Sequence, residues 1–239
     1  MTTNYMSRLE LDELGEAFIQ QYFSKHPSKA KGYVDIDNFI SDYLGLTIQY
    51  LPFAENDMGK LAFLADGRTP LLVYQYDNVV PCILPKNTIA ISTTIIDEKE
   101  RNRCRFAKAH EASHFILSRV NKRDYCAQFY NDFSGADSYG SEELFNILNA
   151  DEWQANALGS AILMPKFLIQ RALAKYNNSR PIKYYGSATL TTQDKAKIKA
   201  MANELRVSLI ALTIRLKDLQ LLEYHDMGEY ITSELMIGD

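Results

Sequence analysis

The segment RFAKAHEASHFIL constrains the fold of this chain more than any other part of the sequence. It places His110 and His114 four residues apart, with Glu111 between them. Residues four apart lie on one face of an α-helix, one turn above each other, so both imidazoles reach a single metal ion only if the segment is helical. The apolar periodicity from Asp97 to Val120 predicts such a helix.

Glu111 projects about 100° around this helix from His110, which places it beside a bound metal rather than on it. From there it can take a proton from a water molecule whose pKa a zinc ion has lowered to about 7. The spacing therefore predicts that His110 and His114 bind Zn²⁺ and that Glu111 is the general base. The alternative is an ordinary amphipathic helix with satisfied polar residues, because the motif also occurs without a metal.

A catalytic zinc requires three protein ligands and one open position. Leu117 and Val120 stand where an extended histidine motif would place its glycine and third histidine, so a carboxylate is the expected third ligand. Glu152 in ADEWQANALGSAILMP is best placed, because the next turns are small or apolar and predict a buried helix face. A lone carboxylate on such a face needs a partner. Three other acidic residues remain alternatives: Asp151, Glu142 and Glu143.

The remaining patterns predict an α+β fold in which a small mixed sheet packs on helices, followed by a C-terminal segment similar to a helix-turn-helix. Helical spacing or capping signals mark five further segments: 8–23, 35–45, 141–164, 166–176 and 193–219, the last divided near Arg206. Short runs of β-branched and aromatic residues predict four strands: 46–51, 61–64, 71–76 and 88–92. We expect a loop at 121–140 and two domains, 1–178 and 188–239, joined by the turn-rich stretch 177–189.

Composition limits the compartment and the partners. The net charge of -4 gives no basic field that would attract nucleic acid or a membrane surface. The N-terminus lacks the apolar region of a signal peptide, and no apolar stretch is long enough to span a membrane. Cys82, Cys104 and Cys126 form no CxxC pair and are expected to be reduced thiols. We therefore expect a cytoplasmic protein with no membrane partner.

Three motifs taken together, HEASH, EWQAN and ILMP, are similar to those of the ImmA/IrrE family of zinc metallopeptidases. The resemblance covers roughly residues 8–170. It implies a zincin-like metallopeptidase domain with His110, His114 and Glu152 as zinc ligands, Glu111 as the base and Asn156 as a supporting partner. Two departures, at Ala112-Ser113 and Trp153-Gln154, remove no ligand.

Members of that family cleave a repressor protein and so release genes for stress responses or mobile-element transfer. The resemblance therefore implies a site-specific endopeptidase whose protein substrate is a helix-turn-helix repressor. Two alternatives are a zinc-binding sensor that does not hydrolyse and a DNA-binding regulator with a peptidase-like domain. DNA binding needs a concentrated basic face, whereas the basic residues of 188–239 are interspersed with acidic ones, so we expect this segment to contact protein.

Two further segments are candidates for contacting the substrate. The strand TIAIS (88–92) is either a sheet edge on which an extended peptide lies by strand addition, or a plain core strand. The tyrosine-rich stretch 124–139 is either a substrate lid or a solvated connector.

Overall fold

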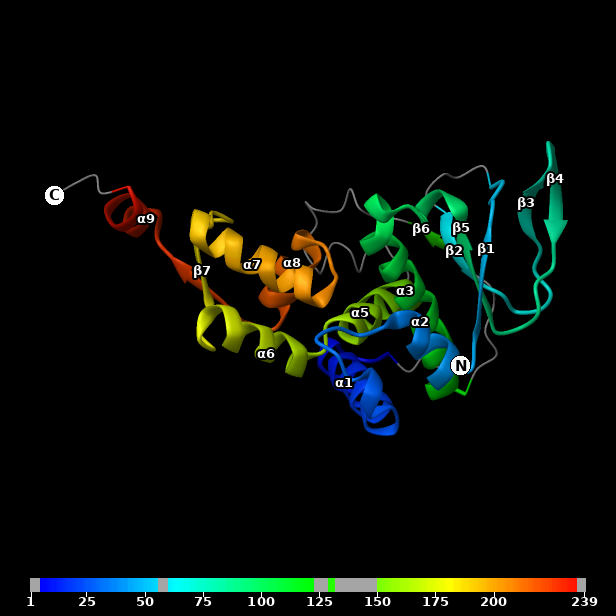
Figure 1. Ribbon diagram of the computed structural model, residues 1–239, viewed down its shortest axis with the longest axis horizontal. Helices are drawn as coiled ribbons and strands as arrows, with labels where there is room; N and C mark the ends of the chain where they lie inside the picture. Colours follow the sequence, from blue (N-terminus) through cyan, green and yellow to red (C-terminus); the bar gives the residue numbers. More distant parts are fainter. Residues whose placement is uncertain (1–4, 56–59, 123–128, 132–149, 236–239) are drawn as a thin grey trace. The chain divides into compact units, whose positions relative to one another are not determined.

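The computed structural model describes residues 5–55, 60–122, 129–131 and 150–235 (Figure 1). It confirms the α+β class, with helices and small sheets in one chain. Among the described residues, none of the helices combines the length and apolar character needed to span a bilayer. The chain forms two compact units, Met1–Leu163 and Met164–Asp239.

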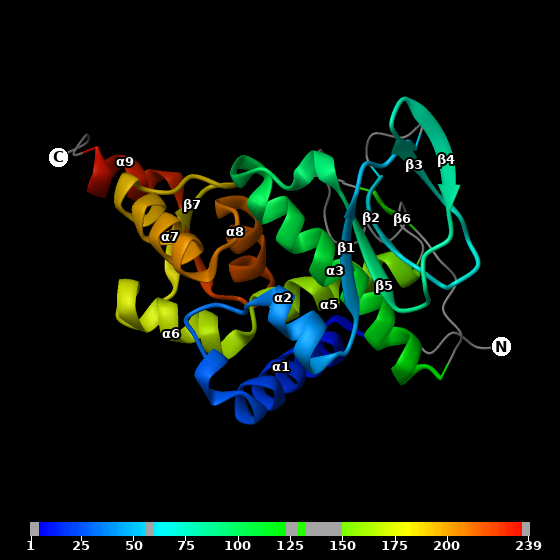
Figure 2. The same cartoon turned by 45° about the vertical axis from the view of Figure 1, so that its right-hand side comes forward.

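The first unit holds a four-stranded sheet, a hairpin and most of the long helices. Its elements follow in chain order: α1 (Arg8–Lys25), a 3-10 turn (Pro27–Lys29), α2 (Ile36–Asn38), a π-helical turn (Phe39–Tyr43), β1 (Thr47–Leu51), β2 (Lys60–Leu64), β3 (Leu71–Gln75), β4 (Asn78–Cys82), β5 (Thr88–Ser92), two 3-10 turns (Thr93–Ile95 and Glu98–Glu100), α3 (Arg101–Val120), β6 (Phe129–Asn131) and α5 (Ala150–Leu163). Both views show α3 between the sheet and α5, with α1 on the other side of α5 (Figures 1 and 2).

Capping residues begin the first two helices where the sequence predicts them. The Ser7 hydroxyl accepts a hydrogen bond from the Glu10 backbone N–H, and the Glu10 carboxylate accepts one from Ser7 N–H. This reciprocal pair is a capping box, which satisfies donors that a helix start leaves open. Asp35 caps α2 through the N–H of Asn38. Local side-chain chemistry therefore accounts for both starts.

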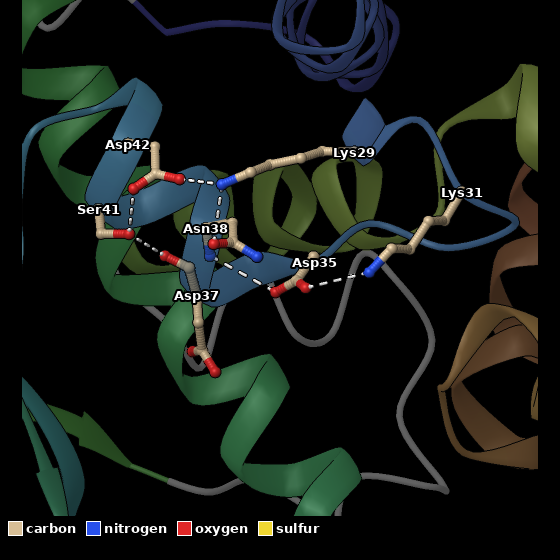
Figure 3. A network of polar contacts seen from close by, with 7 residues as sticks. All are labelled: Lys29, Lys31, Asp35, Asp37, Asn38, Ser41 and Asp42. Carbon is tan, nitrogen blue, oxygen red and sulfur yellow. Dashed lines mark hydrogen bonds and ion pairs between the residues drawn. The ribbon is translucent and has the colours of Figure 1, made fainter. Parts of the chain in front are cut away.

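A polar network ties α2 to the metal-motif helix. Lys29 Nζ contacts the Asp42 carboxylate and lies 3.0 Å from Asn38 Oδ1, while Asp37 points away from them toward α3 (Figure 3). There the buried Lys108 ammonium lies 2.6 Å from Asp37 Oδ1 and 2.8 Å from the Tyr50 hydroxyl. Lys108 thus joins α2 and β1 to α3 two residues before His110.

The central sheet has the strand order β1-β5-β2-β6. β1 pairs parallel with β5, and β2 pairs antiparallel with both β5 and β6. Every residue of β5 (Thr88–Ser92) is buried and both of its edges are paired. The edge-strand hypothesis for TIAIS is therefore wrong, because its continuous apolar run belongs to a central strand, which is the alternative reading.

Two strands of the first unit lie outside the predicted set. β4 contains Pro81, and proline normally argues against a strand. Val80 pairs with Val73 inside the hairpin. Backbone nitrogens along a strand point alternately toward and away from the paired strand, so the nitrogen of the next residue, Pro81, points away from β3. The proline therefore removes no hydrogen bond between β3 and β4. β6 lies within the expected loop 121–140 and depends on pairing with the distant β2. The expected helix start at 141–149, Cys126 and the remainder of 124–139 lie outside the described residues.

The second unit is mainly helical. Its elements follow in chain order: α6 (Lys166–Asn177), β7 (Ile182–Tyr185), α7 (Thr192–Leu205), α8 (Leu209–Asp218), β8 (Leu222–His225) and α9 (Met227–Glu234). Arg206 ends α7 in the left-handed conformation, with φ 56°, and the Ser208 hydroxyl caps α8, as the sequence predicts. The packed side chains of this unit include Arg215, which is 1% exposed and donates from Nε to the Met164 carbonyl at 3.2 Å.

The stretch 177–189, predicted to be a linker, instead contains a strand. β7 pairs parallel with β8, forty residues further along the chain, and both Ile182 and Tyr185 are buried. Pro181 and Gly186 are residue types typical of linkers, but here they stand immediately before and after the strand. The division between the units falls after Leu163, so α6 belongs to the second unit.

Candidate metal centre

The metal-motif residues lie where α3 packs on α5. His110, Glu111 and His114 are on the middle turns of α3, which is buried over most of its length. Glu152 is in the first turn of α5, whose later turns are small or apolar and buried, as the sequence predicts. The two helices bring together residues more than thirty positions apart in the chain.

Potential ligand atoms of three residues converge at this contact. His110 Nε2 lies 2.9 Å from His114 Nε2 and 3.2 Å from Glu152 Oε2, and His114 Nε2 lies 3.3 Å from Glu152 Oε1. One ligand atom from each of these residues can be chosen so that all three lie within 4.8 Å of one another. In the parts of the chain that the structure describes, this is the one group of three or more such residues able to hold a metal ion.

The spacing of these atoms fits a small cation. Zinc bonds to imidazole nitrogen and carboxylate oxygen are about 2.0–2.2 Å long, so a tetrahedral site places its ligand atoms about 3.3 Å apart. The three separations, which involve both oxygens of the Glu152 carboxylate, agree with that value to within a few tenths of an ångström. The cluster could therefore bind a metal ion with little rearrangement. Two imidazoles and a carboxylate suit zinc, but several other divalent transition metals accept the same donors.

The protonation states also suit a metal ligand set. Burial lowers the pKa of His110 to about 4, which keeps its imidazole neutral at pH 7. Burial by itself would raise the pKa of Glu152, but its close contacts with the His110 and His114 imidazoles outweigh that effect and lower the pKa to about 2. A metal ion requires deprotonated ligands, and the folded chain holds both groups in that form.

Asn156 orients one of the imidazoles. It lies one turn after Glu152 on α5, and its Oδ1 is 3.0 Å from His110 Nδ1. Because an amide oxygen only accepts, Nδ1 carries the proton and the Nε2 lone pair faces the cluster. Such a partner fixes both the tautomer and the ring direction of a metal-binding histidine.

Glu111 is fully buried on α3 beside His110 and is not among the convergent ligand atoms. Its role as a base therefore stays a prediction. Of the alternative third ligands, Asp151 is exposed in the first turn of α5, whereas Glu142 and Glu143 lie outside the described residues. His225, in the second unit, is paired with Glu229 at 2.7 Å and takes no part in the cluster.

Contacts that no local sequence pattern indicates hold the first turn of α5. Gln154 is 1% exposed, accepts a hydrogen bond from Met6 N–H at 2.9 Å and donates one to the Ala150 carbonyl at 3.1 Å. The Tyr5 ring stacks on Trp153 with centroids 5.6 Å apart. These contacts flank Glu152, and the residues joined by the Met6–Gln154 bond are 148 positions apart, beyond the reach of local pattern.

Comparisons with known proteins add no relative: no protein-family model matches the chain, and no curated protein matches it. The similarity to the ImmA/IrrE family therefore depends on the three motifs alone.

Proposed function

We propose that this protein is a zinc-dependent endopeptidase that cleaves a specific regulatory protein. The observation that supports the proposal best is the convergence of His110, His114 and Glu152 beside the buried Glu111. Two imidazoles and one carboxylate on packed helices match the three-ligand composition of hydrolytic zinc sites, which keep a fourth position for water. A zinc site that only stabilises a fold usually has four protein ligands.

The chemistry assigned to the chain is hydrolysis of a peptide bond. A bound zinc ion would lower the pKa of a coordinated water to about 7 and polarise the substrate carbonyl. Glu111 takes a proton from the attacking water, whose oxygen forms the new bond to the carbonyl carbon. The carbon–nitrogen bond then breaks, and Glu111 delivers the proton to the leaving amine. Asn156 and Glu152 hold the His110 ring in one orientation during both steps.

The fold assignment and the family belong to the same proposal. A helix carrying HEASH, packed on a small sheet on one side and on a helix carrying EWQAN on the other, is the arrangement expected of a zincin-like domain. The motif similarity to ImmA/IrrE metallopeptidases suggests that the substrate is a helix-turn-helix repressor. Such a role would place the protein in the cytoplasm.

The second unit is our candidate for contacting that substrate. The outward residues of α8 include Leu209, Ile210 and Ile214, of which the last two are 52% exposed. The exposed Arg206 and Lys217 stand at the two ends of this apolar strip, which would complement an amphipathic segment with acidic flanks. A helix that reads DNA needs polar and basic side chains on its outer face, and Arg215 is buried. These features favour a protein partner over duplex DNA.

The test is cleavage of a purified helix-turn-helix repressor encoded beside the gene for this protein. The zinc-loaded protein should cut it at one or a few sites, while leaving casein intact. Glu111→Gln, loaded with the same amount of zinc, should cut neither. Equal cleavage by Glu111→Gln would refute the assigned base. Zinc binding with no cleavage of any repressor would favour the non-hydrolytic sensor.

A further inference from the structure

A glycine on α5 lies against the backbone of the helix that carries both histidines. A Cβ atom added at Gly159 would be 3.2 Å from the His110 nitrogen, 3.3 Å from the Ala109 carbonyl carbon and 3.4 Å from the Ala109 oxygen. All three are backbone atoms of α3, so no side chain can rotate to make room. The absence of a side chain at 159 thus sets how closely α5 approaches α3 at the peptide before His110.

The same face of α5 carries the metal-site residues. Gly159 follows Glu152 by seven residues, which is two helical turns, and Asn156 lies between them. The Asn156 amide oxygen reaches His110 at 3.0 Å, and the Glu152 carboxylate reaches both imidazoles at 3.2 and 3.3 Å. Any change in the α3–α5 spacing at Gly159 is therefore transmitted along one rigid helix to both groups.

We propose that Gly159 is a positioning residue for the metal centre, because it sets the helix spacing that lets Glu152 share one ion with His110 and His114. The proposal rests on the metal centre of the proposed function. Glycine in a helix interior is less stable than alanine, so a glycine there implies a gain from close approach. Metal–ligand bond lengths usually lie within about 0.2 Å of their preferred values. An alanine at 159 would force α5 and the backbone of α3 apart by a few tenths of an ångström.

The opposite face of α5 provides a matched control. Gly15 of α1 meets Ala161, where an added Cβ would lie 2.7 Å from the Ala161 Cβ and 3.2 Å from its carbonyl carbon. Gly15→Ala therefore introduces a contact at least as close in the same packed unit. However, Gly15→Ala crowds α5 from the α1 side and inserts no atom between α3 and α5, the two helices that carry the ligand cluster. General loosening of the packing would affect zinc binding in both variants, whereas positioning would affect it only in Gly159→Ala.

The experiment measures zinc affinity by competition with a chelator, and the visible spectrum of the Co²⁺-loaded protein, in the full chain. Gly159→Ala should weaken zinc binding by about 10-fold to 100-fold, the range found when groups that orient metal ligands are removed. It should also alter the Co²⁺ spectrum, because the carboxylate is displaced from the ion. Gly15→Ala should retain the wild-type affinity and spectrum. In a Glu152→Ala background, Gly159→Ala should cause a smaller loss than in the wild type, because only the Asn156 contact with His110 remains to be displaced.

Wild-type affinity and spectrum in Gly159→Ala would overturn the proposal, as would an equal loss in Gly15→Ala or a full additional loss in the Glu152→Ala background. If Gly159→Ala does not fold, Ala155→Ser replaces it, because Ala155 is buried one turn closer to Glu152 on the same face. The same outcomes then apply to it. A wild-type protein that binds zinc but cleaves no protein would overturn the proposed function alone, whereas one that binds no zinc would overturn both.

Discussion

Removing the carboxylate of Glu152 tests the ligand assignment with a calculable effect. Its oxygens lie 3.2 and 3.3 Å from the two imidazole nitrogens. Glu152→Ala leaves a site with two imidazoles. Zinc sites with four protein ligands bind with about 10–16 kcal/mol at pH 7, which is about 2.5–4 kcal/mol for each ligand. Loss of one ligand should therefore weaken zinc binding by about 100-fold to 1,000-fold.

Thermal or urea unfolding with added zinc measures this effect through linkage. With free zinc about 1,000-fold above its dissociation constant, the wild-type protein should gain about 4 kcal/mol in free energy of unfolding. At the same zinc concentration the Glu152→Ala variant should gain only about 0.4–1.4 kcal/mol, because its dissociation constant is larger by the factor above. Each protein is compared with its own metal-free form, so any direct effect on packing cancels.

Asp151→Asn is the matched control, since it removes one negative charge from the adjacent exposed position of the same helix. It should keep the full zinc-dependent gain. If Asp151→Asn and Glu152→Ala lose zinc stabilisation equally, the effect is one of general charge, and the reasoning from ligand geometry is wrong. If Glu152→Ala keeps the full gain, the third ligand lies elsewhere.

Three further results are expected. Asn156→Ala should weaken zinc binding by about 10-fold to 100-fold in a chelator competition, because His110 loses the acceptor that orients it; wild-type affinity would refute that role. The free energy of unfolding of the metal-free protein should fall by up to about 3 kcal/mol between about pH 6.5 and pH 4, since unfolded His110 takes up a proton that the folded imidazole, with its pKa lowered to about 4, refuses. Because the pKa of Glu152 is lowered, this residue reduces the free energy of unfolding only when the pH falls below its ordinary pKa of about 4.5. A free energy of unfolding, measured by urea titration, that does not change with pH above about 4.5 would therefore contradict the burial of a neutral His110. Replacing Ile210 and Ile214 with serine should lower kcat/KM for the repressor by about 10-fold to 100-fold while zinc content stays unchanged; an unaltered kcat/KM would exclude this surface from recognition.

Features encoded by neighbouring residues were predictable from the sequence. The HEASH helix needs only its four-residue histidine spacing, and the helix starts after Ser208 and Asp35 need only a capping side chain. Glu152 was identified from the small and apolar turns that follow it, and the structure brings it to the two histidines. These inferences succeed because periodicity and capping act within one or two turns.

Features that depend on distant pairing were not predictable. β7 looks like a linker because Pro181 and Gly186 bound it, and its partner β8 lies beyond two intervening helices. The apolar run of TIAIS is compatible with a central strand, but no pattern within it indicates that β1 and β2 are the neighbours of β5. The Met6–Gln154 bond and the contact of Gly159 with the α3 backbone likewise exist only after the helices have packed.

The metal content of three purified variants tests the central claim most directly. Elemental analysis should find about one zinc ion for each wild-type chain and for each Glu111→Gln chain, since Glu111 is assigned as a base and contributes no ligand atom. His114→Ala, which removes one of the convergent ligand atoms, should retain little or none. Equal zinc in all three proteins, or none in the wild type, would contradict the metal centre on which this account depends.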